Sequence, residues 1–236
     1  MLTIIIPTLN EENYLPLLLK CIKRQSFKDY EIIIADAHST DKTVEVAHEI
    51  GCQVVNGGLP PKGRNEGAGA AKGEMLLFID ADSRILSDDF LEKILQEFKK
   101  RNLDIASFPI YPDENKLDKL IYTFYNLWAK LNQSFLPHAT NVILVKKEIH
   151  QKINGFDEEI KLAEDHEYAR RAGKLGKFGF INIEPIFTSS RRFEKEGRIK
   201  TYFKYGLAGV YILFFGPVKS DIFKYRFGNY LKNKKN

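Results

Sequence analysis

Two aspartates stand one residue apart at the end of a short apolar run, EMLLFIDADS, residues 74–83. In extended backbone, residues i and i+2 point to the same side, so Asp80 and Asp82 would present two carboxylates to one point. Two uncompensated anions that close resist ionising, and a hard divalent cation removes the repulsion. Mg²⁺ or Mn²⁺, with carboxylate, water and phosphate oxygens as ligands, suits this pair. The alternative is that Asp82 and Ser83 merely cap a helix beginning near Asp88, which leaves Asp80 unexplained.

The first half of the chain alternates apolar strands with helices. Strands are expected at residues 2–8, 31–36, 52–55, 74–80 and 104–111. Helices are expected at residues 39–51, 62–73 and 90–98 and, capped by Asn10, over the apolar stripe Leu15, Leu18, Leu19 and Ile22. Strands that are apolar throughout and joined by helices indicate an α/β domain with a mostly parallel sheet and helices on both faces. Ligands bind such sheets at the carboxyl ends of the strands, so Asn10, Asp36 and the Asp80/Asp82 pair should converge on one edge.

The second half is less regular. Residues 116–136 are expected to form an aromatic-rich helix, 139–149 a strand leading into a helix, 161–176 a helix and 177–187 a strand. No internal repeat or low-complexity linker interrupts the chain. A single domain with a C-terminal extension is therefore favoured.

Length and composition indicate a folded globular protein. The chain has 236 residues, 44% of them hydrophobic and 28% charged, with a net charge of +5 and a pI near 9. This balance fits affinity for phosphates, nucleotides or anionic lipid headgroups and does not require nucleic acid. Cys21 and Cys52 form no metal or disulfide pattern, so a reducing cytoplasm is expected. The N-terminus enters a strand at once without a signal-peptide apolar region, and the longest apolar stretch, from Leu207, is too short to span a bilayer.

Four motifs occur in an order and spacing similar to those of the family 2 glycosyltransferases of GT-A fold. They are IPTLNEE after the first strand, IIIADAHSTDKT after the second, GRNEGAGAAKGEMLLFIDADS, and LAEDHEYARRAG. The resemblance covers roughly the first four-fifths of the chain. It implies the GT-A, or nucleotide-diphospho-sugar transferase, fold, with a catalytic domain over residues 1–199.

The resemblance also implies a role for particular residues. Asp82 would be the direct metal ligand, with Asp80 beside it and nearer the ribose. In the ED motif, Glu164 precedes Asp165, which would be the general base, and Arg192 would steady the diphosphate. The nucleotide pocket would be lined by Pro7, Thr8, Glu11, Asp36, Arg64, Asn65 and Asp80.

The chain departs from the family pattern at two places. Ala37 and His38 stand where the family often has an aspartate and a glycine, which leaves the identity of the base open. Ser189 and Phe193 replace the glutamine or arginine and the tryptophan of the family's xxRW motif, in which Arg192 is retained. His166, next to the ED motif, is expected to be an ordinary residue of a helix surface.

The function implied is transfer of a sugar, with inversion, from a nucleoside diphosphate sugar to a hydroxyl or a lipid phosphate. UDP is favoured over GDP, with Mn²⁺ or Mg²⁺ as cofactor. A sugar nucleotidyltransferase is disfavoured because IPTLNEENY lacks the glycine-rich loop of that class. The alternative from another class is a non-catalytic nucleotide-sugar-binding or membrane-adaptor module, which the altered DAHS motif supports and the retained acidic motifs oppose. The donor sugar, the glycan or lipid-linked acceptor and the oligomeric state stay open.

The last segment, residues 200–236, is rich in aromatic and basic residues and almost free of acids. Such a segment can lie in a membrane interface, with aromatic rings at headgroup depth and lysines on anionic lipid. It can equally be a helix that closes over the catalytic domain or packs in a dimer. Stacking on single-stranded nucleic acid is a weaker third interpretation. Membrane attachment would place a cytoplasmic enzyme peripherally on the cytoplasmic face of the membrane.

Overall fold

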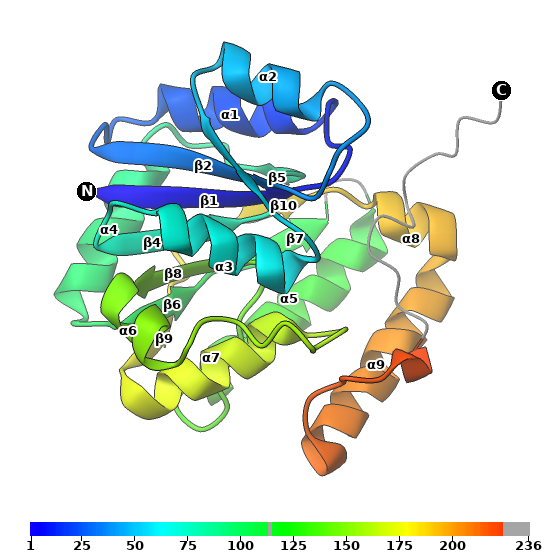
Figure 1. The fold of residues 1–236 in the computed structure, drawn as a ribbon. Coiled ribbons are helices and arrows are strands. Elements are labelled where there is room, and N and C mark those ends of the chain that lie inside the picture. The colour runs from blue at the N-terminus through cyan, green and yellow to red at the C-terminus, as the bar shows by residue number, and fades with distance from the viewer. Residues whose placement is uncertain (113–114, 224–236) are drawn as a thin grey trace, which may run out of the picture.

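The computed structural model describes residues 1–112 and 115–223 (Figure 1). Its main sheet has seven strands in the order β3-β2-β1-β4-β8-β6-β9. Only β8 runs against its neighbours, because it pairs antiparallel with both β4 and β6. The strands are β1 Leu2–Thr8, β2 Tyr30–Asp36, β3 Gln53–Asn56, β4 Met75–Ile79, β6 Ile105–Ser107, β8 Val142–Lys146 and β9 Phe178–Phe180.

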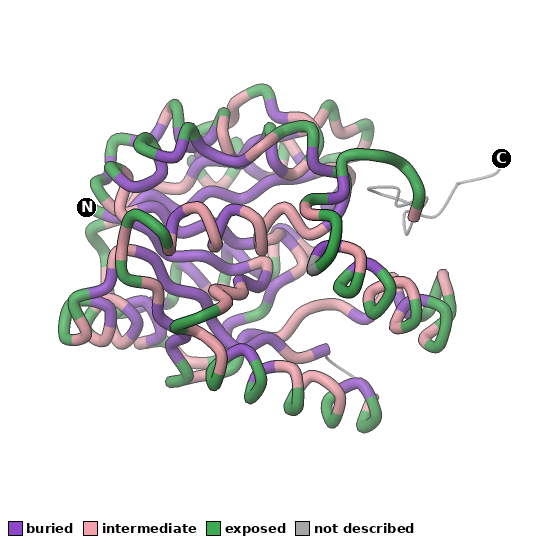
Figure 2. The backbone as a smooth tube through the Cα atoms, turned by 90° about the horizontal axis from the view of Figure 1, so that it is seen from below, coloured by how far each residue is buried: buried purple, intermediate pink, exposed green. Residues whose placement is uncertain are grey.

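Helices cover both faces of this sheet, as the sequence predicts. One face packs against α1 (Leu15–Arg24), α2 (Thr43–Glu49) and α4 (Phe90–Lys100). The other face packs against α3 (Pro60–Ala70), α6 (Lys147–Lys152) and α7 (Glu164–Leu175). Alternate residues of each strand enter the two cores, so the central strands are buried along their whole length (Figure 2). The predicted fold class is confirmed.

A second, three-stranded sheet lies beyond the carboxyl ends of the main one. Its order is β5-β10-β7, formed by Ser83–Arg84, Ile186–Thr188 and Ile110–Pro112. The predicted single strands at 104–111 and 177–187 are therefore wrong, because each breaks in two and contributes to both sheets. Pro109, at the first break, has no N–H to donate to a ladder.

Both expected helix caps differ from the prediction, whereas the helix start expected at residue 90 is that of α4. Asn10 does not cap α1, whose N-cap is Tyr14; Asn10 has φ 54° and its side-chain oxygen accepts from the Thr40 N–H at 2.7 Å. Residues 83 and 84 are in β5, and α4 begins only at Phe90. The capping explanation of Asp82 and Ser83 therefore fails, and the strand end must be explained by other contacts.

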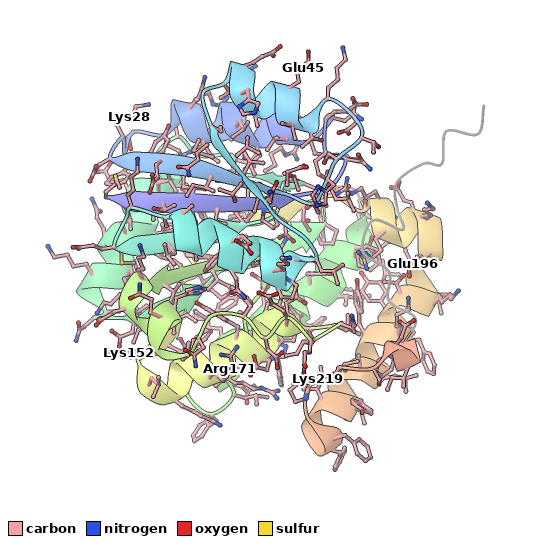
Figure 3. All side chains as sticks on the ribbon, viewed as in Figure 1. Lys28, Glu45, Lys152, Arg171, Glu196 and Lys219 are labelled. Carbon is pink, nitrogen blue, oxygen red and sulfur yellow. The ribbon has the colours of Figure 1, made fainter. Side chains whose placement is uncertain are left out.

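The described residues contain three further helices, α5 (Lys116–Asn132), the short α8 (Arg191–Glu196) and α9 (Arg198–Phe215), followed by the 3₁₀ turn η1 (Asp221–Phe223). Lys219 Nζ donates to Asp157 Oδ2 at 2.9 Å and to Glu159 Oε2 at 2.8 Å, and Lys204 pairs with Glu196 at 2.8 Å (Figure 3). These contacts tie the segment after α9 to the loop before α7, and α9 to α8. The lysine-rich end, residues 224–236, lies outside the described residues, and the division at residue 199/200 stays a prediction. No helix within the described residues has the length and apolarity needed to cross a bilayer.

Candidate active site

Side chains at the carboxyl ends of β1 and β2 meet, as the parallel register of these strands requires. Thr8 Oγ1 donates to Asp36 Oδ1 at 2.9 Å. Asp36 also accepts from the backbone N–H of Ser39 at 2.8 Å and from the Ser39 hydroxyl at 2.6 Å. The buried carboxylate therefore organises the turn after β2. Its predicted contact with a nucleotide base stays a prediction.

A buried arginine joins the DxD motif to the ED motif. Arg64, in α3, is 3% exposed, and its Nη2 donates to Asp80 Oδ1 at 2.9 Å while its Nη1 donates to Glu164 Oε1 at 2.7 Å. Its guanidinium also lies over the ring of Phe156, 5.3 Å from the centroid. Burial by itself would lower the pKa of Arg64, but Asp80, Glu164 and Asp165 outweigh burial and raise it. Two acidic motifs 84 positions apart in the chain are thus held together by one permanent cation.

A second arginine, Arg191 in α8, bridges Glu11 and Asp82. Its Nη1 and Nη2 donate to Glu11 Oε2 and Oε1 at 2.8 and 2.6 Å, and Nη2 lies 3.3 Å from Asp82 Oδ2. The guanidinium stacks on Tyr14 at 4.5 Å. A small cavity of about 30 Å³ remains between these groups, lined by Pro7, Glu11, Pro60, Asp80, Ala81, Asp82 and Arg191.

The carboxylates of this second cluster are not fully compensated by Arg191. Burial raises the pKa of Glu11 to about 7, Asp82 and Asp80 add to the rise, and Arg191 opposes it. Burial also raises the pKa of Asp82, with Arg191 opposing and Asp80 reinforcing the shift. Both carboxyl groups are therefore harder to ionise than exposed ones, and a further cation beside them would favour their charged forms.

Asp80 and Asp82 line the same small cavity, so a divalent ion there would have two carboxylates from this chain and would need further ligands from elsewhere. Among the residues that the structure describes, no three His, Cys, Asp or Glu side chains gather as a ready-made metal site. The chain would then supply the carboxylates of Asp82 and Asp80, and diphosphate and water oxygens the remaining ligands. This division of ligands is typical of Mg²⁺ at phosphate-binding sites.

The predicted base, Asp165, lies in the first turn of α7, next to Arg64's partner Glu164. Its Oδ1 accepts from the backbone N–H of His166 at 2.9 Å, and Nδ1 of the same histidine is 3.6 Å away. Burial raises the pKa of the Asp165 carboxyl, with Glu164 adding to the rise and His166 and Arg64 opposing it. Ala163, immediately before this pair, has φ 61°, a conformation costly for a residue with a Cβ.

His166 is not the ordinary surface residue that the sequence predicted. Its ring stacks on that of His138 with centroids 3.5 Å apart. His138 in turn contacts the rings of Tyr125 and Trp128 from α5, at 5.6 and 5.0 Å. Burial lowers the pKa of His138 to about 2, so this imidazole is neutral. An aromatic wall therefore lies beside the predicted base.

The structure brings most of the predicted residues together and leaves two elsewhere. Asn65 donates to the Phe156 carbonyl and to Glu158, both at 2.9 Å, so its amide holds the loop before α7. Arg192 is hydrogen-bonded to Tyr205 of α9, while its neighbour Arg191 meets the carboxylates. The predicted nucleotide role of Asn65 and diphosphate role of Arg192 stay predictions.

Sequence reasoning missed Arg191, Tyr14 and the bridging function of Arg64. The segment SSRRF contains two adjacent arginines, and the family's xxRW motif matches the second, Arg192. Opposite charges at residues 11, 82 and 191 were visible in the sequence. Nothing local indicated that they would meet.

Comparison with known families and proteins gives a consistent result. The model of the family described as "Glycosyl transferase family 2" matches residues 3–154. An uncharacterized glycosyltransferase of Bacillus subtilis, EpsJ, is 26% identical over 89% of this chain and 72% of its own length.

Two solved structures share the fold. Staphylococcus aureus TarS 1-349 in complex with UDP-GlcNAc superposes with a TM-score of 0.65 at 20% identity, over 80% of this chain and 58% of TarS 1-349. The mannosyltransferase PcManGT from Pyrobaculum calidifontis, in complex with GDP-Man and Mn²⁺, gives 0.70 at 19%, over 88% and 61%. The chain thus spans less than two thirds of either structure. The predicted GT-A fold is confirmed.

Proposed function

The chain belongs to glycosyl transferase family 2, and from that premise we propose that it transfers a sugar, with inversion, from a nucleoside diphosphate sugar to a hydroxyl or a lipid phosphate. One observation carries the proposal: Arg64 binds Asp80 of the DxD motif and Glu164 of the ED motif at the same time. The donor site and the predicted base are thereby held at one strand edge, as a single displacement reaction requires.

The donor is proposed to lie across the ends of β1, β2 and β4. Pro7, Thr8 and Asp36 are the groups nearest the base and ribose, and Asp80 and Asp82 face the diphosphate. A bound Mn²⁺ or Mg²⁺ would offset the negative charge that develops on the leaving diphosphate. UDP is the first choice of nucleotide and GDP the second; the related structures contain one of each.

Arg191 is proposed to exchange its carboxylate partners for the diphosphate. A guanidinium held by Glu11 and Asp82 already lies beside the proposed metal and diphosphate site, and an arginine pairs well with phosphate oxygens. A divalent ion held by Asp82 would weaken the attraction between that carboxylate and Arg191. Arg192 remains the family-based candidate for the same role, which paired variants can separate.

Asp165 is proposed to accept the proton of the attacking hydroxyl. Its raised pKa makes it a stronger base than an exposed aspartate, and its place beside Glu164 aims it at the same edge. Attack from the side opposite the leaving diphosphate inverts the anomeric carbon. If the acceptor is a lipid phosphate, which is already ionised, Asp165 positions it instead of deprotonating it.

The alternative is a non-catalytic nucleotide-sugar-binding or membrane-adaptor module. One observation favours it: His38 takes φ 60° where the family often has glycine, and Asp36 is engaged by Thr8 and Ser39. The base pocket is thus altered. The two free cysteines support a reducing, cytoplasmic location for either function.

The first test is a thermal-shift panel of UDP, GDP, CDP and TDP, each with and without Mn²⁺. Ligand at a hundred times its Kd stabilises the native state by about 2.7 kcal/mol, a measurable shift in Tm. We expect one nucleotide to stabilise the wild type only with metal, Asp82→Ala to abolish the shift, and Asp88→Ala, an exposed aspartate, to retain it. Absence of any nucleotide shift would overturn the proposal.

Asp165→Asn separates the enzyme from the binding module. If the chain is an enzyme, Asp165→Asn should slow donor cleavage or transfer by about 10²–10⁴-fold. The same variant should still show the increase in Tm on binding nucleotide. A nucleotide shift together with no turnover in the wild type would favour the non-catalytic module.

A further inference from the structure

Helix α5 presents a continuous apolar face to solvent. Its members recur every three or four residues, the spacing of one helix face, and each is 42–70% exposed. The face consists of Leu117, Leu120, Phe124, Leu127, Trp128 and Leu131. Phe135, just past the helix, is 91% exposed. A monomer rarely leaves so long an apolar stripe uncovered unless it is a docking surface.

Helix α9 carries a second such face. Its apolar members are 46–88% exposed: Ile199, Phe203, Leu207, Val210, Phe214 and Phe215. The two helices are tied together at their first turns, where Arg198 Nε and Tyr202 Oη donate to the carboxylate of Asp118 at 3.0 and 2.8 Å. Both lie on the same side of the molecule, away from the N-terminus (Figure 1).

The charges along these two helices are almost all positive. Helices α5 and α9 contain a single acidic residue between them, Asp118, which is fully buried. The exposed lysines of these helices are Lys116, Lys119, Lys130 and Lys200, whereas Lys204 is 15% exposed and pairs with Glu196. Apolar faces flanked by exposed lysines complement an anionic bilayer surface. A second copy of the chain would bring the same cations into opposition, which disfavours a dimer through this face.

We propose that the apolar faces of α5 and α9 dock on an anionic membrane surface. The inference rests on the proposed function only where it concerns how an acceptor reaches the site. Tyr125 and the docking-face residue Trp128 both contact His138, whose ring stacks on His166 beside Asp165. Trp128 therefore belongs to the docking face and to the aromatic wall, and it joins the two directly. A lipid-linked acceptor would reach the site without leaving the membrane surface.

Trp128 makes this proposal directly testable, because it is the sole tryptophan of the chain and part of the docking face. The full-length protein is mixed with vesicles of neutral lipid or of neutral lipid with 30% anionic lipid, at 50 and 500 mM salt. We expect binding to the anionic vesicles, weakened at high salt, with a blue shift of Trp128 emission and quenching by lipids brominated on their acyl chains.

Charged substitutions on the face supply the matched comparison. Leu120→Glu with Phe124→Glu in α5, and Phe203→Glu with Phe214→Glu in α9, should each lower the partition onto anionic vesicles at least tenfold. Leu17→Glu with Leu86→Glu places the same change on two equally exposed leucines elsewhere and should leave the partition unchanged. The melting temperature of each variant confirms that it is folded.

Three results would overturn the proposal: no sedimentation of the wild type with anionic vesicles at low salt, sedimentation without quenching of Trp128, or an equal loss in the Leu17 and Leu86 control. A wild-type dimer that the α5 variant dissociates, without vesicle binding, would show a second copy as the occupant instead. The nucleotide thermal-shift panel on the same variants is independent of lipid. If no nucleotide raises the Tm while vesicle binding is intact, the proposed function is rejected and the docking surface is still supported.

Discussion

Two arginines bridge pairs of carboxylates at the same sheet edge, and they are held in different ways. Arg64 belongs to an eleven-residue helix packed on the sheet, is 3% exposed and is covered by Phe156. Arg191 belongs to a six-residue helix near the end of the described chain and is 15% exposed. The first cation is part of the core, and the second rests on the surface of the site. The difference indicates that Arg64 stabilises the structure of the site, whereas Arg191 can change partners when a ligand binds.

The largest expected difference is in stability. Arg64→Met leaves Asp80 and Glu164 without their cation and should lower the free energy of unfolding by about 3–4 kcal/mol. Arg191→Met should cost about 1 kcal/mol or less near pH 6, because Glu11 can then take up a proton. Urea unfolding measures both, with the exposed Arg24→Met as control. Equal losses at the two arginines would break the comparison.

The second expected difference is in pH dependence. Glu11 ionises near its usual value of 4.5 in the unfolded chain and near 7 in the fold. Between these pH values the folded state binds more protons, so stability falls as pH rises through this window. Relative to Glu11→Gln, the wild type should lose about 2–3 kcal/mol of unfolding free energy between pH 4 and pH 8. Urea unfolding across this range tests the value, with Glu66→Gln as control, and a constant difference would contradict it.

The third difference is in metal binding without nucleotide. Removing Arg191 withdraws a positive charge from Asp82, so Mn²⁺ alone should bind roughly tenfold tighter, about 1.4 kcal/mol, to Arg191→Met. Arg192→Met should show a smaller change in the same direction, because the charge of Arg192 acts on Asp82 more weakly than that of Arg191. The nucleotide diphosphate should show the opposite sign and bind more weakly to Arg191→Met. Electron paramagnetic resonance of free Mn²⁺ measures the first effect, and an unchanged Kd would mean that Arg191 does not compete with the ion.

The smallest expected effect concerns backbone strain at Ala163, next to Glu164, one of the two carboxylates that Arg64 binds. Ala163 takes φ 61° just before Glu164, and glycine adopts this conformation without the clash of a Cβ. Ala163→Gly should therefore raise the unfolding free energy by about 0.5–1 kcal/mol. Ala169→Gly, within the same helix, should lower it by about 1 kcal/mol. Thermal unfolding of the two variants distinguishes them, and the same sign for both would rule out strain at Ala163.

The sequence by itself determined the layered fold and the edge at which the chemistry lies. Alternate burial of apolar residues along β1, β2 and β4 requires helices on both faces, and parallel strands bring their carboxyl ends to one edge. Asp36 is the last residue of β2, and Asp80 and Asp82 come just after β4. Their convergence therefore needs no information beyond the local pattern.

Only the tertiary structure decided which side chains meet across that edge. The segment SSRRF does not indicate which arginine pairs with the carboxylates. In the fold Arg191 pairs with Glu11 and Asp82, while Arg192 hydrogen-bonds Tyr205 and lowers the pKa of Asp82 through its charge. Pairs such as Arg64 with Glu164 join residues 100 positions apart. No local periodicity encodes such a contact, because it depends on how separately formed elements pack.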